Sequence, residues 1–148
     1  MDTLKERLRT DLTAALRAKD ELRKSTIRSV LAAIKNAEVA QTPSITLDDP
    51  AIEQLIQTEI KRRNESAQIY ADAGRAEQVG KERDEAAILA EYLPQQLSSD
   101  ELASIVDEQV SAAGDGAKMG PVIAAVRARV GQRASGGAVA AAVKARLG

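Results

Sequence analysis

Residues 91–102 read EYLPQQLSSDEL, and this stretch lies between two regions with helical patterns. Pro94 disfavours helical backbone at the residue before it, so it predicts the end of a helix. Ser98 followed three residues later by Glu101 is the pattern of a capping box, which predicts the start of the next helix. We therefore expect a junction between a region 1–93 and a region 94–148. The residues assigned to it are Tyr92, Leu93, Pro94, Ser98 and Glu101.

Apolar residues recur every three or four positions on both sides of this junction, which is typical of amphipathic helices. The spacing predicts four helices before it: over residues 3–18, from Asp20 to about Ala40, from Pro50 to the turn at Gly74, and from Ala76 to Leu93. It predicts three helices after it: one that follows Ser98, one that carries Met119 to Val130, and a short one that carries Val139 to Leu147. No apolar run alternates as a β-strand does. The predicted fold class is all-α, with a four-helix domain followed by a three-helix domain.

The residue types that are absent limit the chemistry of the chain. Its 148 residues include no cysteine and no histidine, which excludes a thiolate nucleophile, an imidazole base and the usual zinc ligands. Catalysis would have to rest on carboxylates, lysine, tyrosine or hydroxyl groups, and we assign no catalytic residue, no metal and no cofactor. No apolar run approaches the ~20 residues that span a bilayer, so we expect no membrane partner. The N-terminus lacks a signal-peptide core and the chain has no disulfide, and on this basis we expect a cytoplasmic location.

The formal net charge of −1 conceals two opposed blocks. Residues 77–110 hold nine acidic and two basic side chains, whereas residues 111–148 hold one acidic and six basic side chains. Cations grouped in a small region favour contact with a phosphate backbone, although scattered solubilising charge fits the sequence equally well. The candidate phosphate contacts are Lys118, Arg127, Arg129, Arg133, Lys144 and Arg146. Arg129 and Arg133 are four residues apart, which predicts that they share a helix face. This region has no aromatic side chain, so it favours recognition of backbone and shape over base stacking.

Other charged runs have simpler interpretations. The acidic clusters ERDE at 82–85 and SSDEL at 98–102 fall on helix surfaces or helix starts, where carboxylates are stabilised without any catalytic role. The basic run KRRNES at 61–66 is typical of a solvated helix face, with a phosphate or partner contact as the alternative. The glycine-rich GDGAKMGP at 114–121 lacks the spacing of a nucleotide-binding loop.

Several short motifs together resemble a known family. The most specific are AIKNAE at 33–38, YLP at 92–94 with QLS at 96–98, and Met119-Gly120. They resemble the YqeY-like proteins, which are small bacterial proteins related to the tail domain of the GatB subunit of glutamyl/aspartyl-tRNA amidotransferase. The similarity extends over nearly the whole chain.

The resemblance implies an N-terminal helical domain, 1–93, and a GatB tail-like domain, 94–148, joined after the Tyr-Leu-Pro segment. It also implies a relation to tRNA, because the tail domain of the amidotransferase helps to hold tRNA. Two departures affect the second region: Pro121 stands where the family usually has lysine, and Ser135 stands at an aspartate position.

Three hypotheses follow. The first is a non-catalytic module that binds tRNA through the six cations of residues 111–148. The second is an amidotransferase or an accessory subunit of one, a carbon–nitrogen ligase with glutamine as amide donor, and this class would associate with amidotransferase or other translation-related proteins. The third is a protein-binding scaffold whose acidic block meets a basic partner.

Overall fold

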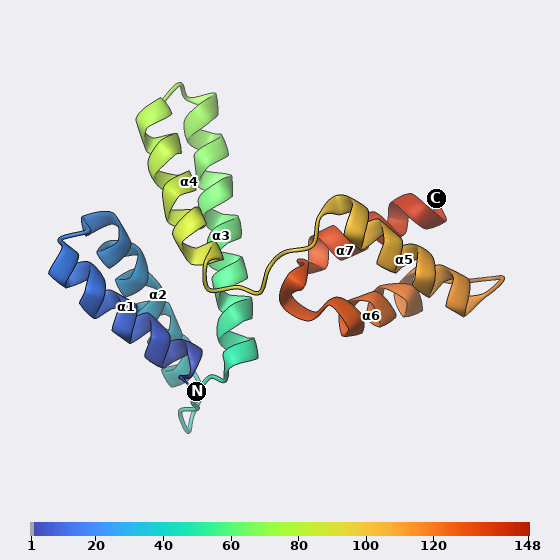
Figure 1. Ribbon diagram of the computed structural model, residues 1–148, viewed down its shortest axis with the longest axis horizontal. Helices are drawn as coiled ribbons and strands as arrows, with labels where there is room; N and C mark the ends of the chain where they lie inside the picture. The colour runs from blue at the N-terminus through green and yellow to red at the C-terminus, as the bar shows by residue number, and fades with distance from the viewer. Residues whose placement is uncertain (1) are drawn as a thin grey trace. The chain divides into compact units, whose positions relative to one another are not determined.

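The structure, a computed structural model, describes residues 2–148. The all-α prediction is confirmed, because these residues form seven α-helices and one short 3-10 helix and include no strand (Figure 1). The chain divides into two compact units, of which the first ends at Leu93 and the second begins at Pro94. That each unit folds independently, as domains of the kinds the resemblance implies, stays a prediction.

The first unit consists of two helical hairpins. Its helices are α1 (Leu4–Ala18), α2 (Glu21–Val39), α3 (Asp49–Asp72) and α4 (Ala76–Ala90). Helix α2 folds back beside α1, and α4 folds back beside α3 (Figure 1). One face of each helix is apolar, and these faces meet in an almost purely aliphatic core. The buried residues of this core are Leu4, Leu8, Ile27, Val30, Ile34, Ile52, Ile56, Leu89 and Tyr92.

Local side-chain bonds determine where these helices begin. The Thr3 hydroxyl accepts a hydrogen bond from the Glu6 N–H, and the Glu6 carboxylate accepts one from the Thr3 N–H, which completes the expected capping box. Asp20 caps α2 in the same manner. Pro50 lies in the first turn of α3, where the missing N–H costs no helical bond.

The second unit is a small bundle of α5 (Ser99–Ala113), α6 (Met119–Val130) and α7 (Gly136–Leu147), with the 3-10 helix η1 (Gly131–Arg133) between the last two. Its core is built from valine and leucine: Leu102, Val106, Val122, Val126, Val130, Val139 and Val143 are buried. The predicted capping box at the start of α5 is present, since Ser98 Oγ accepts from the Glu101 N–H at 3.1 Å and the Ser98 N–H donates to Glu101 Oε1 at 3.0 Å.

Helix α4 ends three residues earlier than the sequence predicts. It stops at Ala90, and the next three N–H groups, those of Glu91, Tyr92 and Leu93, each donate to the carbonyl three residues back. Such bonds tighten the last turn of a helix and satisfy carbonyls that would otherwise be unpaired. Pro94 contributes to the stop, because it disfavours helical backbone at Leu93 and has no N–H to donate to the Ala90 carbonyl four residues back.

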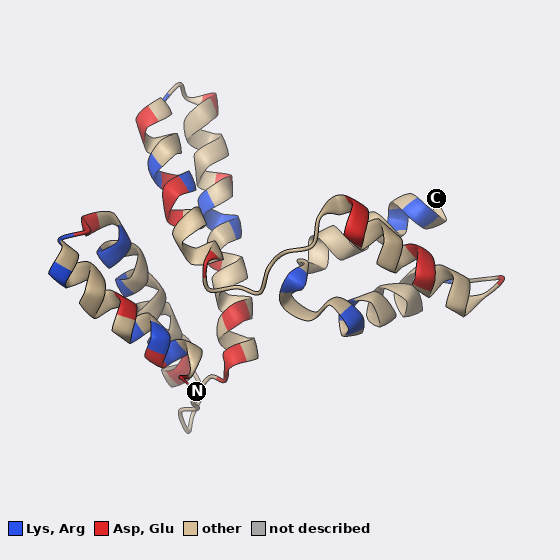
Figure 2. Cartoon of the chain, in the orientation of Figure 1, with Lys and Arg blue, Asp and Glu red and all other residues tan. Residues whose placement is uncertain are grey.

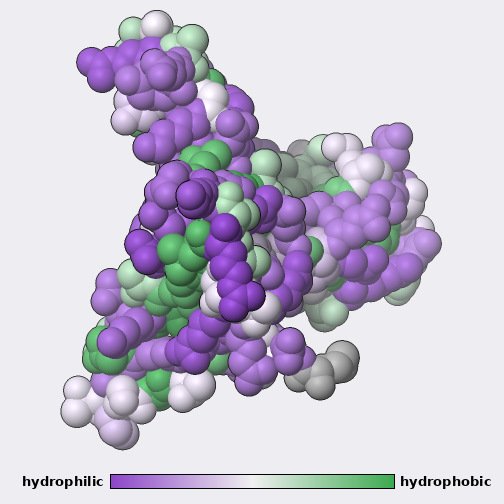
Figure 3. Space-filling model, turned by 60° about the vertical axis from the view of Figure 1, so that its left-hand side comes forward, coloured by the Kyte–Doolittle hydropathy of each residue, from purple (hydrophilic) through white to green (hydrophobic). Residues whose placement is uncertain are grey.

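Polar side chains cover most of one face of the molecule. In Figure 3 hydrophilic residues occupy most of the visible face, and hydrophobic ones appear there in small patches. No helix in residues 2–148 is both long enough and apolar enough to cross a membrane.

Candidate nucleic-acid interface

The six candidate cations lie on α6, η1 and α7, opposite an acidic α5. Figure 2 shows this partition within the second unit: basic residues mark α6, η1 and α7, while acidic residues mark α5 and the turn that follows it. The partition has a direct cause in the sequence, because Asp115 is the only carboxylate side chain after residue 110. The positive charge left on α6, η1 and α7 therefore depends on how many of these cations pair with carboxylates of α5.

Two of the six cations are paired with α5. Arg146 Nε donates to Asp107 Oδ1 at 2.7 Å, and Arg129 Nη1 pairs with the Glu108 carboxylate. All four side chains are about half exposed, and ion pairs of this kind contribute only ~0–1 kcal/mol to stability. Their main effect is electrostatic: each carboxylate cancels a charge that would otherwise face an anionic ligand.

Arg133 is held against its own backbone. Helix α6 ends at Val130, because Gly131 adopts a φ of +57° that breaks the helical path. Arg133 therefore lies on η1, and its guanidinium donates to the carbonyls of Val130 at 3.3 Å and Arg129 at 3.4 Å. The prediction that Arg129 and Arg133 share a helix face is wrong for this reason.

The remaining three cations form no ion pair in the part of the chain that the structure describes. The guanidinium of Arg127 lies over the start of α7, with its Cζ 3.8 Å from the position of a Cβ at Gly136. Lys118 is the N-cap residue of α6, but its side chain makes no capping hydrogen bond. Lys144 lies in the last turn of α7. Because α7 runs back along α6 (Figure 1), Lys118 and Lys144 lie toward one end of the pair and Arg127 and Arg133 toward the other. The structure therefore places the unpaired charge at both ends of the α6–α7 pair rather than in one cluster.

The junction residues that precede Pro94 hold the end of α4 to α1. Tyr92 is 3% exposed, its hydroxyl donates to Asp11 Oδ2 at 2.5 Å, and the Arg7 guanidinium lies 4.7 Å from its ring centre. Burial, followed by the bond to Asp11, raises the pKa of the Tyr92 phenol. Arg7 also donates to the Glu91 carbonyl at 3.2 Å. Tyr92 is therefore a structural anchor of the first unit.

The junction residues that follow Pro94 begin the second unit. The N–H of Leu97 donates to the Arg133 carbonyl at 2.8 Å, and the Gln96 side chain donates to the Gln132 carbonyl at 2.9 Å. The hydrogen bond that the Ser98 N–H donates to the Glu101 carboxylate, followed by the interaction with the Ser98 side chain, lowers the pKa of Glu101. The carboxylate of Glu101 is thus a capping group, as the sequence predicts. The ties to η1 are beyond sequence reasoning, because they join residues more than thirty positions apart.

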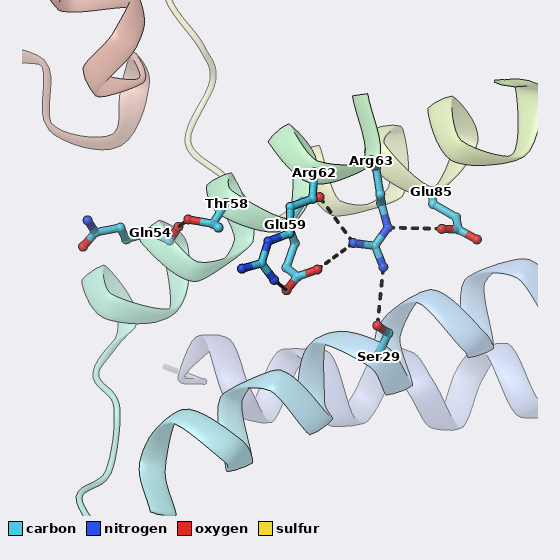
Figure 4. A network of polar contacts seen from close by, with 7 residues as sticks. All are labelled: Ser29, Gln54, Thr58, Glu59, Arg62, Arg63 and Glu85. Atoms are coloured by element: carbon cyan, nitrogen blue, oxygen red, sulfur yellow. Dashed lines mark hydrogen bonds and ion pairs between the residues drawn. The ribbon is translucent and has the colours of Figure 1, made fainter. Parts of the chain in front are cut away.

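The basic run 61–66 has a structural role. Arg63 is 12% exposed, and its guanidinium bonds Glu85 Oε2 at 3.1 Å, Glu59 Oε2 at 2.8 Å and Ser29 Oγ at 3.4 Å (Figure 4). It therefore links α2, α3 and α4. The other two cations of the run also face carboxylates of α3, Lys61 with Glu65 and Arg62 with Glu59.

The described residues provide no cluster of metal ligands. Nowhere in residues 2–148 do three or more aspartate and glutamate side chains converge as metal ligands. A groove of about 570 Å³ runs between α5 and α7, and alanine, leucine and valine make up most of its lining. It offers few polar groups to orient a ligand.

Comparison with known proteins identifies the family. The family model described as Yqey-like protein matches residues 5–147. The chain belongs to the YqeY-like protein family. The resemblance seen in the sequence is confirmed, and the match extends through both units.

The curated relatives of this YqeY-like chain include proteins from yeasts. It is 38% identical over 88 residues to "Altered inheritance of mitochondria protein 41, mitochondrial" of Lachancea thermotolerans, which covers 60% of this chain and 46% of the relative. It is 33% identical over 111 residues to the protein of the same name from Saccharomyces cerevisiae strain S288c, which covers 75% of this chain and 58% of the relative. The chain thus spans about half the length of these relatives.

These names contradict the predicted location. Both relatives are mitochondrial by name, so the cytoplasmic prediction is wrong on this comparison. The prediction failed because its evidence was weak: a lack of cysteine and of a signal-peptide core does not separate one reducing compartment from another.

The two departures from the YqeY-like pattern have simple structural outcomes. Pro121 lies in the first turn of α6, where no helical bond requires its N–H. Ser135 is the N-cap of α7, and its hydroxyl accepts from the Ala138 N–H at 3.1 Å. Serine and aspartate are both strong N-cap residues, so the substitution preserves the helix start.

Proposed function

We propose that this YqeY-like chain is a non-catalytic module that binds the phosphate backbone of tRNA through its second unit. The resemblance to the GatB tail domain supplies the class of ligand. The chemistry of the second unit supports a polyanion, because six cations on α6, η1 and α7 meet only two carboxylates of α5.

One observation carries the proposal. Four of the six cations form no ion pair in the described chain, and residues 111–148 hold a single carboxylate side chain, that of Asp115. The four are Lys118, Arg127, Arg133 and Lys144. Unpaired cations on a small bundle raise the local concentration of an anionic ligand and form contacts that release its counterions.

The expected mode of recognition is sequence-independent. The second unit has no Phe, Tyr or Trp, so it has no platform for stacked bases. Lysine and arginine contacts to phosphates position a nucleic acid without reading its sequence. Discrimination among RNAs would then rest on their shape.

The test is a salt titration of tRNA binding by the full chain. Wild-type protein should show a linear fall of log affinity with log salt. A variant with Gln in place of Lys118, Arg127, Arg133 and Lys144 should lose about 3 units of that slope if all four contact phosphates, at roughly 0.7–0.9 per contact. Binding that cannot be detected at about 50 mM salt, or a variant whose slope equals that of the wild type, would overturn the proposal.

A further inference from the structure

A second group of unpaired cations lies in the first unit, on α2 and its neighbour α1. Residues 22–37 contain no acidic side chain and four basic ones, although the first unit as a whole carries both signs of charge. The cations of this run that form no ion pair within the unit are available to an anionic ligand.

Two of these four cations are engaged within the unit and two are not. Arg23 pairs with Glu91 at 2.8 Å, and Lys24 pairs with Glu21 at 2.6 Å. Arg28 and Lys35 are exposed and form neither an ion pair nor a side-chain hydrogen bond within residues 2–148. They are seven residues apart, which is about two helical turns, so they lie on the same side of α2 about 10 Å apart along its axis.

Arg9 of α1 lies on the same side of the α1–α2 hairpin. Lys5 Nζ of α1 pairs with Glu38 Oε2 of α2 at 2.5 Å, which fixes the register of the two helices. Arg9 is one turn beyond Lys5 on α1, and Lys35 is about one turn before Glu38 on α2, so the antiparallel pairing brings them to the same level. Glu38 lies near Arg9 and already accepts hydrogen bonds from Lys5 and the Leu47 N–H. Arg9 also borders a hollow that Glu6, Asp48 and Asp49 help to line, but it forms no ion pair within residues 2–148.

The surface around these cations is mostly small and polar. We call Arg9, Arg28 and Lys35 the hairpin face. On α2 the exposed residues between and beside Arg28 and Lys35 are Ser25, Ser29, Ala32, Asn36 and Val39, of which only Val39 is a large apolar residue. A protein partner would need a buried apolar or aromatic anchor, whereas a phosphate backbone needs only cations with small neighbours that allow close approach. Charge and shape therefore favour a nucleic-acid backbone.

We propose that the hairpin face is a second contact for the phosphate backbone of an RNA that the second unit binds. This inference rests on the proposed function for its ligand. The two contacts lie on one covalent chain, so binding at one raises the effective concentration for the other, and the loss of either weakens the whole complex.

The experiment compares two triple variants of the full chain in tRNA binding across a range of salt concentrations. The first replaces Arg9, Arg28 and Lys35 by Gln. The matched control replaces Arg75, Lys81 and Arg83 by Gln; these cations are also exposed, unpaired and in the first unit, but acidic residues surround them in the sequence. The hairpin-face variant should lose about 2–3 units of salt slope and more than about tenfold in affinity at low salt. The control should change affinity by less than about threefold, and both should keep the wild-type thermal midpoint, because the substituted side chains are exposed.

The outcomes separate this inference from the proposed function. If the hairpin-face variant binds as the wild type does while the second-unit variant loses affinity, the inference fails and the proposed function stands. If only the hairpin-face variant loses affinity, the hairpin face is supported and the proposed role of the second unit fails. An equal loss in the control variant overturns the inference, because net charge alone would then explain the effect. A protein that binds wild type stoichiometrically after nuclease treatment, but not the hairpin-face variant, also overturns it.

Discussion

Lys19 adopts a backbone conformation that suits glycine better. It is the C-cap of α1, and among residues 2–148 it alone of the non-glycine residues has a positive φ, of 57°. For a residue with a Cβ the left-handed region costs roughly 1–2 kcal/mol. The Lys19 side chain makes no bond that repays this cost.

Replacing Lys19 by Gly should therefore stabilise the protein. Glycine removes the steric penalty but adds entropy to the unfolded chain, so we expect a net gain of about 0.5–1 kcal/mol in the free energy of unfolding. Urea denaturation followed by circular dichroism measures it. Lys35→Gly is the matched control: the same change inside an exposed helix should cost about 1 kcal/mol. A loss of stability in Lys19→Gly would show that the helix end does not carry this strain.

At the scale of whole helices, the Lys5–Glu38 pair joins α1 to α2 and should make stability depend on pH. The hydrogen bond from Lys5, and then that from the Leu47 N–H, holds the pKa of Glu38 below its ordinary range. A lowered native pKa stabilises the fold at pH values above the ordinary glutamate pKa, where the carboxylate is ionised, and this contribution is lost as the pH falls through the lower native value. The urea midpoint of Glu38→Gln should therefore lie below that of the wild type at pH 7 and approach it at pH 3.

Glu53 of α3 provides a control of opposite sign. Burial, and then the nearby charge of Asp49, raises the pKa of Glu53. A raised native pKa means that the ionised carboxylate destabilises the fold, and that this penalty disappears as the pH falls. Glu53→Gln should thus have a higher urea midpoint than the wild type at pH 7, with the difference shrinking in acid. Parallel pH dependence in the two variants would contradict both assignments.

Helix boundaries show which elements the sequence can predict. The starts of α1 and α5 were predictable because a capping box is local, involving two residues three positions apart. The end of α6 at Val130 also agrees with the predicted helix, and the positive φ of Gly131 is what ends it. The end of α4 was less predictable, because the apolar spacing continues to Leu93 while the helix stops at Ala90.

For the molecule as a whole, the charge that reaches a ligand depends on α5. Asp107 and Glu108 neutralise Arg146 and Arg129. Under the proposed function these carboxylates compete with RNA phosphates for the same guanidinium groups. Converting them to the isosteric amides, Asp107→Asn with Glu108→Gln, should therefore tighten tRNA binding by roughly three- to tenfold at low salt.

The control for this prediction removes two acidic charges elsewhere. Glu77→Gln with Asp84→Asn makes the same change of net charge on α4, where both side chains are exposed and unpaired. Its tRNA affinity should stay close to that of the wild type. If the two double variants gained affinity equally, long-range charge rather than release of Arg129 and Arg146 would be the cause.

The candidate site was less predictable than the fold. Composition identified the six cations, and helical spacing identified the elements that carry them. Their pairing was hidden, because Asp107 and Arg146 are 39 residues apart and meet only when α5 and α7 pack. The hairpin face was hidden for the complementary reason: the sequence shows four cations on α2, but only the structure shows that Arg28 and Lys35 are the unpaired ones.

The short ties at the start of the second unit have an evolutionary consequence. Gln96 and Leu97 bond to η1, and Ser98 caps α5, so every signal that begins this unit lies within residues 94–148. A gene fusion that cut the chain just before Pro94 would carry those signals with it. We therefore expect the second unit to keep the start of α5 when it is joined to the end of a different protein.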